Sequence, residues 1–320
     1  MASSPQPTSG DDAADRDGLR PGRVLVVGGS GKTGRAVAGA LLRRGARVQV
    51  TVRPGREGTA PHGSTPVPLD LDDGAGLGAA LRDVDAVYHL APNVHPGEVG
   101  MAHRVAEAAG SSGVRRVVFH SVLHPNDPRM PHHLRKAEAE SVLRDRIGDR
   151  LVVLRPAAYH QNLLDAVLTG AVTVPYSLDA RFTNVDLGDV AEVAAGMLLS
   201  PGHGGEVHDL VGPEEMTTRE MARTAVDVLG REVRARSIPL AQWSAGPGAA
   251  LPTAARTALE AMFAAYDEDG LTGDPRPLAD LLGRRPTTWA ETVRRAATTS
   301  GIAGGPATLA VDPPTPRSTP

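Results

Sequence analysis

The feature that most constrains the fold of this chain is an apolar run followed by regularly spaced glycines near the N-terminus. Residues 24–27, Val-Leu-Val-Val, are apolar without alternation, which is typical of a parallel strand covered on both faces. Gly28, Gly31 and Gly34 follow at a spacing of three residues, and a helical pattern begins after them. A strand, a glycine turn and a helix N-terminus together form a pyrophosphate site, because free N–H groups and the positive helix end attract an anion.

The string Gly-Ser-Gly-Lys-Thr in this stretch also resembles the end of an ATP-binding P-loop. That motif, GxxxxGK followed by Ser or Thr, places its first glycine where Val26 stands in this chain, inside the predicted strand. The P-loop interpretation therefore fails. The spacing GxxGxxG instead fits a dinucleotide loop, and the alternative is a tight turn in another kind of α/β protein. The loop residues expected to contact the cofactor are Gly28, Ser30, Gly31, Lys32, Thr33 and Gly34.

Composition excludes several classes of protein. The net charge of −3 gives no sign of a surface for nucleic acid or anionic membrane. Cysteine is absent, which excludes disulfides and thiolate chemistry, and no apolar run is long enough for a transmembrane helix. The N-terminal residues lack the apolar core of a secretory signal, so we expect a cytoplasmic protein. Arginine outnumbers lysine 32 to 2, a bias typical of GC-rich bacterial coding, which draws attention to Lys32 and Lys136.

Strand and helix patterns alternate along the chain, which predicts an α/β fold with a doubly wound parallel sheet and a smaller C-terminal substrate lobe. Strands are expected at 23–28, 47–52, 65–70, 86–90, 115–121 and 150–154. A late strand at 207–210 is expected to return to this sheet, and Asp189 is expected to cap a helix over 190–199. The predicted division is a disordered tail at 1–22, an NADP-binding Rossmann domain at 23–155, a substrate lobe at 156–299 and a disordered tail at 300–320.

The end of the second strand decides which dinucleotide is expected. An acidic residue there binds the ribose hydroxyl of NAD, whereas arginine suits the extra phosphate of NADP. Arg53 occupies this position, so the chain is predicted to bind NADP(H); the alternative is an ordinary solvated charge. Two further strand ends are expected to contact the cofactor: Asp70 and Leu71 near the adenine, and Leu90 and Ala91 near its middle.

Several strings in the same order and spacing resemble the NmrA-like family, a branch of the atypical short-chain dehydrogenase/reductases. They are Val-Gly-Gly-Ser-Gly-Lys-Thr-Gly-Arg at 27–35, Val-Thr-Val-Arg-Pro at 50–54 and Arg-Pro-Ala-Ala-Tyr-His-Gln-Asn at 155–162. Asp-Leu-Gly-Asp-Val-Ala at 186–191 and Leu-Gly-Arg-Arg-Pro-Thr-Thr at 282–288 also fit, so the resemblance covers about residues 23–297. It implies a Rossmann-type domain with a C-terminal substrate lobe. It also implies either an NAD(P)H-dependent reductase of quinones or imines or a non-catalytic dinucleotide sensor.

The wider dehydrogenase superfamily uses a Tyr-x-x-x-Lys pair on the helix after the fifth strand, where the lysine holds the nicotinamide ribose and lowers the pKa of the tyrosine. Lys136 matches the lysine, but His132 stands where the tyrosine is expected. The resemblance also gives Ser121, at the end of the fifth strand, the place of a substrate-orienting hydroxyl. Glu138 and Glu140 are expected on the solvated face of that helix.

Three sources of the proton are compatible with the sequence. His132 is one, because imidazole titrates near neutral pH, and His133 beside it is a weaker candidate. Tyr159 or His160, after the sixth strand, would act from the opposite wall. In the third case water protonates a quinone-like acceptor and no side chain is needed.

The preferred hypothesis is an NADPH-dependent oxidoreductase acting on a small quinone, enone or carbonyl compound. The alternative is a non-catalytic NADP(H) sensor that acts on a protein partner, and the missing tyrosine favours it. An epimerase-like enzyme is the weakest hypothesis, because that chemistry needs a strong acid and base. We expect no metal site, no nucleic-acid partner and no membrane partner, and the sequence does not distinguish a monomer from a homodimer.

Overall fold

The computed structural model describes residues 22–301, and most of the two predicted tails lies outside these described residues. Its centre is a parallel seven-stranded sheet in the order β3-β2-β1-β4-β5-β6-β9. These strands are β1 (Arg23–Val27), β2 (Arg47–Val52), β3 (Thr65–Pro68), β4 (Ala86–His89), β5 (Arg116–His120), β6 (Leu151–Pro156) and β9 (Val207–Leu210). The predicted fold class is confirmed, and β9 joins the sheet beside β6 as expected.

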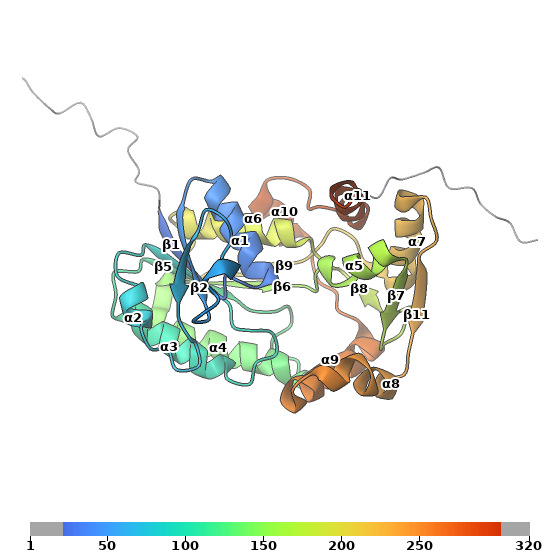
Figure 1. Cartoon of the computed structure of the whole chain (residues 1–320), viewed down its shortest axis with the longest axis horizontal. Helices are drawn as coiled ribbons and strands as arrows, with labels where there is room; N and C mark the ends of the chain where they lie inside the picture. The colour runs from blue at the N-terminus through green and yellow to red at the C-terminus, as the bar shows by residue number, and fades with distance from the viewer. Residues whose placement is uncertain (1–21, 302–320) are drawn as a thin grey trace, which may run out of the picture.

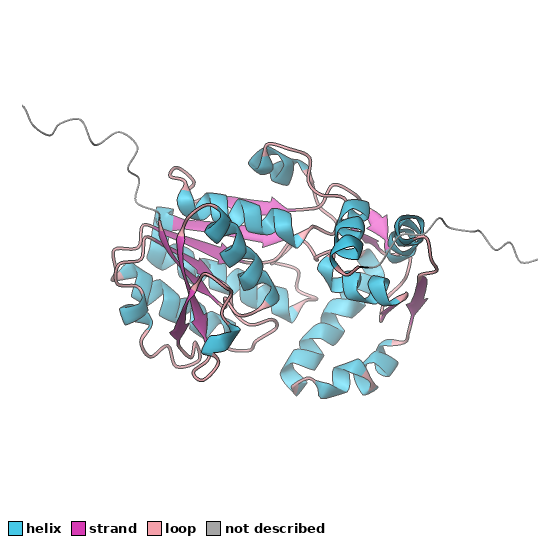
Figure 2. Ribbon diagram, turned by 45° about the horizontal axis from the view of Figure 1, so that its top comes forward, coloured by secondary structure: helices cyan, strands magenta, loops and turns pink. Residues whose placement is uncertain are grey.

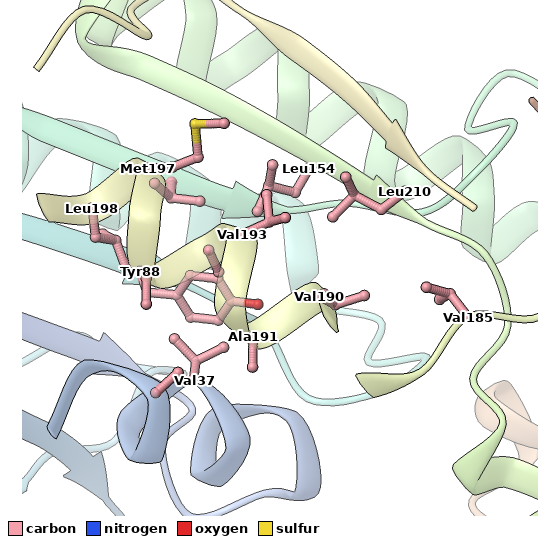
Figure 3. Close-up of a cluster of buried hydrophobic side chains, with 14 of the residues drawn as sticks. Val37, Tyr88, Leu154, Val185, Val190, Ala191, Val193, Met197, Leu198 and Leu210 are labelled. Carbon is pink, nitrogen blue, oxygen red and sulfur yellow. The ribbon is translucent and has the colours of Figure 1, made fainter. Parts of the chain in front are cut away.

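Helices cover both faces of this sheet, which explains why its central strands lack polar alternation. The helices that surround the sheet are α1 (Lys32–Arg43), α2 (Leu77–Ala80), α3 (Glu98–Gly110), α4 (Pro131–Ile147), α6 (Leu187–Leu199) and α10 (Arg276–Leu282). One core lies between the sheet and α1 and α6, where Val37, Tyr88 and Val193 pack together (Figure 3). A second core lies on the opposite face, beneath α3 and α4.

The later residues form a lobe at the carboxyl ends of the strands (Figures 1 and 2). Its elements are α5 (Gln161–Thr169), β7 (Ala171–Val174), β8 (Arg181–Phe182), β10 (Met216–Thr217), α7 (Thr218–Leu229), β11 (Arg234–Ser237), α8 (Leu240–Ala245), α9 (Thr253–Asp269) and α11 (Trp289–Thr299). β7 pairs with β11 in parallel, and β8 pairs with β10 antiparallel. Trp289, fully buried, is at the centre of this lobe's own apolar core.

Two local predictions need correction. α6 begins earlier than predicted, because Asp186 rather than Asp189 caps it by accepting a hydrogen bond from the Gly188 N–H at 2.8 Å. Asp189 instead accepts the Thr287 N–H at 2.6 Å and binds Arg284, so it fastens the segment before α11 to the sheet domain. These partners are almost a hundred positions away in the sequence and left no local signal there.

Candidate active site

The glycine loop joins β1 to α1 and has the close packing that its spacing predicts. Gly28 has a φ of +79°, and a Cβ atom there would lie 2.5 Å from the Leu90 carbonyl oxygen. A Cβ atom on Gly34 would lie 2.2 Å from the Gly28 carbonyl oxygen, so α1 approaches β1 only because residue 34 has no side chain. The Thr51 hydroxyl accepts the Gly28 N–H at 2.9 Å and fixes the start of the loop, a role that sequence reasoning missed.

A cleft of about 1280 Å³ extends from this loop to the C-terminal lobe. It brings together the predicted cofactor residues except Gly34, which packs against the loop from behind. It also brings together the predicted catalytic residues Lys136, His132, Ser121 and Tyr159, together with His133. The cleft lies at the carboxyl ends of β1 and its neighbour β4, where the strand order reverses and α/β proteins bind their ligands.

Positive charge gathers at the glycine-loop end of the cleft. Arg53 and Arg56 are exposed there and form no ion pair with any residue between 22 and 301. Arg35 has a structural role, because its Nε donates to the Ser30 carbonyl at 2.8 Å and a terminal nitrogen donates to the Thr59 carbonyl at 2.5 Å. Asp70 Oδ1 accepts the Asp72 N–H at 2.9 Å, and Asp70 also lines the cleft.

Lys32, the first residue of α1, reaches across the cleft toward the later lobe. Its Nζ donates to the Asn162 side-chain oxygen at 2.8 Å and lies 5.8 Å from the centre of the Tyr159 ring. Partial burial lowers the pKa of this ammonium. Lys32 therefore links the glycine loop to α5, a contact that the phosphate role expected from the sequence does not include.

Lys136 on α4 belongs to a buried ion pair. Its Nζ lies 2.5 Å from Glu98 Oε1, and the two side chains are 5% and 0% exposed. The same ammonium donates to the His120 carbonyl at 2.9 Å and lies 5.2 Å from the centre of the Phe119 ring. Glu98 begins α3, which packs closely against α4, so the pair joins two neighbouring helices at the floor of the cleft, which Lys136 lines.

His120, the last residue of β5, connects two tyrosines that the sequence separates widely. Its Nε2 lies 2.7 Å from the Tyr159 hydroxyl, and its Nδ1 is hydrogen-bonded to the Tyr88 hydroxyl. Burial, with a contribution from nearby Lys136, lowers the pKa of His120 to about 3, so the ring is neutral at pH 7. Burial raises the pKa of Tyr159 above its ordinary value. Sequence reasoning missed His120, although its position at the carboxyl end of a central strand was a usable signal.

The histidine at the position of the expected tyrosine is buried in the first turn of α4. Burial and the Lys136 charge lower the pKa of His132 to about 3, so it holds no imidazolium proton at neutral pH. This argues against the role of His132 as the acid. His133 beside it lies 3.1 Å, through Nδ1, from the His124 carbonyl. His160 faces away from the cleft, with its Nδ1 2.9 Å from the Thr292 hydroxyl and its ring against Trp289, so it is not placed to supply a proton there.

Ser121 and Glu140 differ from expectation in a related way. The Ser121 hydroxyl donates to Glu140 Oε1 at 2.5 Å and is fully buried. Glu140 also receives two hydrogen bonds from the Arg155 guanidinium, at 2.9 and 2.5 Å. Glu140 was predicted on the solvated face of the helix; this is wrong, because its side chain is buried against partners from β6 and from the residue that follows β5. Glu138 is exposed as expected. The Ser121 hydroxyl proton is therefore already donated within the protein.

Residues 22–301 contain neither a candidate metal centre nor a membrane-spanning helix. No cluster of three or more His, Cys, Asp or Glu side chains is arranged to hold a metal ion. None of the helices in this range is both long and apolar enough to cross a membrane.

Comparison of the sequence with known protein families gives a match that covers most of the chain. The profile of the NmrA-like family matches residues 21–292, which is most of the chain. The chain belongs to the NmrA-like family. The resemblance drawn from the glycine loop and the later strings is thereby confirmed.

Several proteins that are similar in sequence to this chain are named as reductases or oxidoreductases. The (4-alkanoyl-5-oxo-2,5-dihydrofuran-3-yl)methyl phosphate reductase of Streptomyces griseus is 33% identical over 247 residues, covering 75% of this chain and 81% of that protein. Quinone oxidoreductase 2 of Escherichia coli is 26% identical over 279 residues, covering 84% of this chain and 97% of that protein. The crystal structure of an E. coli NADPH-dependent quinone oxidoreductase in complex with NADPH shares the fold, with a TM-score of 0.73 and 23% identity over 85% of this chain and 99% of that chain.

Proposed function

We propose that this protein is an NADPH-dependent oxidoreductase that transfers a hydride to a small quinone, enone or carbonyl compound. The observation that carries the proposal is the position of the Tyr159–His120 pair in the same cleft as the dinucleotide loop. The NmrA-like relatives that are named as reductases support the oxidoreductase class. In this proposal residues 23–155 hold the cofactor and the lobe at 156–299 holds the substrate.

The residues of the cleft fit NADP(H). Gly31 caps α1 without a side-chain hydrogen bond, and no acidic residue lies in the first turn, so the N–H groups there are suited to a pyrophosphate. Arg53 is suited to the phosphate that distinguishes NADP from NAD, because its guanidinium has no carboxylate partner within residues 22–301. Asp70, Leu71, Leu90 and Ala91 line the walls between these points and would contact the rest of the dinucleotide. When bound, NADPH supplies the hydride.

The Tyr159–His120–Tyr88 chain supplies the proton in our proposal. A neutral imidazole carries hydrogen on one nitrogen only, so the chain has a direction. When Tyr88 donates to Nδ1, the Nε2–H donates to the Tyr159 oxygen, and the Tyr159 O–H is left to point into the cleft, where the Thr33 side chain lies within hydrogen-bond reach. The substrate then gains one hydride from the cofactor and one proton from Tyr159, and Nε2–H stabilises the oxygen that has lost the proton. Because burial raises the pKa of Tyr159, the proton leaves only as negative charge develops on the acceptor oxygen.

One observation favours a second function, that of an NADP(H) sensor. Lys136 is bound to Glu98 and His132 is neutral, so the Tyr–Lys pair of the superfamily has no counterpart on α4. A protein that binds the cofactor through the glycine loop without reducing a substrate would need nothing more. In that case a protein partner would respond to the redox state of the cofactor.

The deciding experiment measures NADPH oxidation with a panel of quinones, enones and simple carbonyl compounds, beside NADPH affinity by calorimetry. We expect turnover, and we expect Tyr159→Phe to lower kcat by about a hundredfold or more while NADPH affinity is retained. Full activity of Tyr159→Phe would remove the proton relay from the proposal. Tight NADPH binding without turnover of any compound would refute the oxidoreductase hypothesis and favour the NADP(H) sensor.

A further inference from the structure

Aromatic residues are rare in this chain and are concentrated in one place. The sequence has nine of them, and six line the cleft. Tyr159 is near the glycine-loop half, and the other five come from the C-terminal lobe. We call those five the aromatic wall: Tyr176, Phe182, Trp243, Phe263 and Tyr266. Core packing explains the three aromatics outside the cleft, which are fully buried, and it also involves Phe182 and Tyr266, which are buried in the first core. It does not explain Tyr176, Trp243 and Phe263, whose rings are only half-buried and line the cavity.

The aromatic wall is built by an amphipathic face of α9. Leu259, Met262, Phe263 and Tyr266 recur at helical spacing and all line the cleft. α8 contributes Trp243, which lines the cleft and is half-buried. α8 contains no fully buried residue. Figures 1 and 2 show α8 and α9 together as an arm between α4 and the rest of the C-terminal lobe. The apolar stripe of this arm therefore faces the cleft as well as the core.

The rings of the aromatic wall contact one another in edge-to-face and tilted arrangements. Trp243 and Phe263 have centres 4.9 Å apart at 78°, and Phe182 and Tyr266 have centres 5.3 Å apart at 79°. Tyr176 lies between them, 5.3 Å from Phe182 and 5.9 Å from Phe263. Such a cluster offers both ring faces and ring edges to a flat ligand, and aromatic pairs in these arrangements attract one another beyond the effect of buried area.

The cleft also differs in charge between its two ends. The glycine-loop end contains Lys32, Arg35, Arg53 and Arg56, whereas the lining from residue 163 onward contains no Asp, Glu, Lys, Arg or His. A charged group placed at the aromatic wall would lose its hydration without gaining a partner. The volume of about 1280 Å³ exceeds the usual range of about 300–1,000 Å³ for one ligand, which leaves room for a second molecule beside a dinucleotide.

We propose that the aromatic wall selects an uncharged acceptor with fused aromatic rings and rejects acceptors that carry an anionic group. This inference rests on the proposed function and deepens it by naming the substrate class. The substrate named for the S. griseus relative carries a phosphate, but the aromatic wall of this chain offers no cation to pair with one. Trp243 and Phe263 are the residues that determine this specificity.

The binding experiment uses calorimetry on the protein with and without saturating NADP⁺, and its probes are not reduced. Naphthol, phenol and naphthalene sulfonate are compared. We expect naphthol to bind about tenfold or more tightly than either of the others. Trp243→Ala is expected to weaken naphthol binding about tenfold, and Phe263→Leu, which keeps most of the volume, about threefold. Gln242→Ala is the matched control, because this exposed neighbour on α8 does not line the cleft.

Turnover of menadione, which has two fused rings, is compared with that of the single-ring duroquinone. We expect Trp243→Ala to lower kcat/KM for menadione selectively. Binding of naphthol without turnover of any quinone, enone or carbonyl compound would support the aromatic wall and overturn the proposed function. Turnover in which both quinones respond equally to Trp243→Ala would leave the function standing and overturn the inference. Equal affinity for naphthol and naphthalene sulfonate, or unchanged naphthol affinity in both wall variants, would also overturn it.

Discussion

Replacing Lys136 by Met tests the buried ion pair at the floor of the cleft. Methionine keeps most of the apolar stem of lysine but removes the ammonium, which lies 2.5 Å from Glu98 and 2.9 Å from the His120 carbonyl. Glu98 then loses its counter-ion in a site where its side chain is 0% exposed. Breaking a buried pair by removing one partner costs about 3–5 kcal/mol, because the remaining charge has lost its hydration and its counter-ion. We therefore expect Lys136→Met to lower the free energy of unfolding by about 3 kcal/mol or more.

The assay is urea unfolding followed by circular dichroism, with the transition midpoint and its slope compared between variants. The double variant Glu98→Gln/Lys136→Met removes both charges and should recover about 2 kcal/mol of the loss. Arg144→Met is the matched control on the same helix. Its guanidinium is about half exposed and lies 3.9 Å from Glu140, so its loss should change stability by less than about 0.5 kcal/mol.

The ion pair also explains why a lysine persists where almost every other cation is arginine. The ammonium is compact, whereas a guanidinium would need more space and more acceptors in this closed site. Lys136→Arg should therefore cost about 1–3 kcal/mol through overpacking. A loss below about 1 kcal/mol in Lys136→Met, or a double variant no more stable than the single one, would refute this account of Lys136.

Three further predictions concern the cofactor loop and the buried histidines. Arg53→Ala should weaken NADPH binding about tenfold or more and leave NADH binding nearly unchanged. Arg47→Ala is the control, because Arg47 is exposed and does not line the cleft. Equal losses of affinity for both cofactors would count against a phosphate contact. Gly34→Ala should weaken binding of both cofactors, because the new Cβ would lie 2.2 Å from the Gly28 oxygen. Gly39→Ala on the same helix should be tolerated, because the nearest atom to its new Cβ is 3.4 Å away. Calorimetry measures cofactor affinity in both variants, and equal effects would contradict the packing argument. Finally, burial lowers the pKa of His89, His120 and His132 to about 3. The free energy of unfolding should therefore fall as the pH drops from 6.5 toward 3, by about 1 kcal/mol per histidine over the first pH unit, because the unfolded chain takes up protons that the folded one excludes. Urea unfolding across this pH range measures the change, and a flat profile would contradict the burial of these histidines.

The dinucleotide loop and the sheet were predictable because their signals are local. Gly28 and Gly34 lie beside the strand and helix that they connect, so one short stretch contains both the turn and the packing constraint. The strands were recognised by apolar runs, since both faces of a parallel sheet are covered. The position of Arg53 after β2 follows from the same order of elements.

The local sequence did not reveal the partners of the polar residues in the cleft. Lys136 was recognised, but Glu98 lies on another helix, so the sequence indicated a ribose contact where the structure has an ion pair. Ser121 was recognised in the same way, but its partner Glu140 looked like a surface residue. Burial changes the role of such polar residues, because a polar side chain that has lost its contact with water must form its hydrogen bonds or ion pairs within the protein.

The sequence by itself determined the fold, and it was enough to predict the glycine loop as the phosphate site and NADP(H) as the cofactor, because each of these depends on residues close together along the chain. Only the tertiary structure showed how the candidate acids are placed and partnered. It excluded His132 by burial and placed His120 between Tyr88 and Tyr159, which are 71 positions apart. Only the tertiary structure gathered five scarce aromatic residues into one wall. Both results depend on long-range proximity and loss of water, and neither leaves a periodic signal in the sequence.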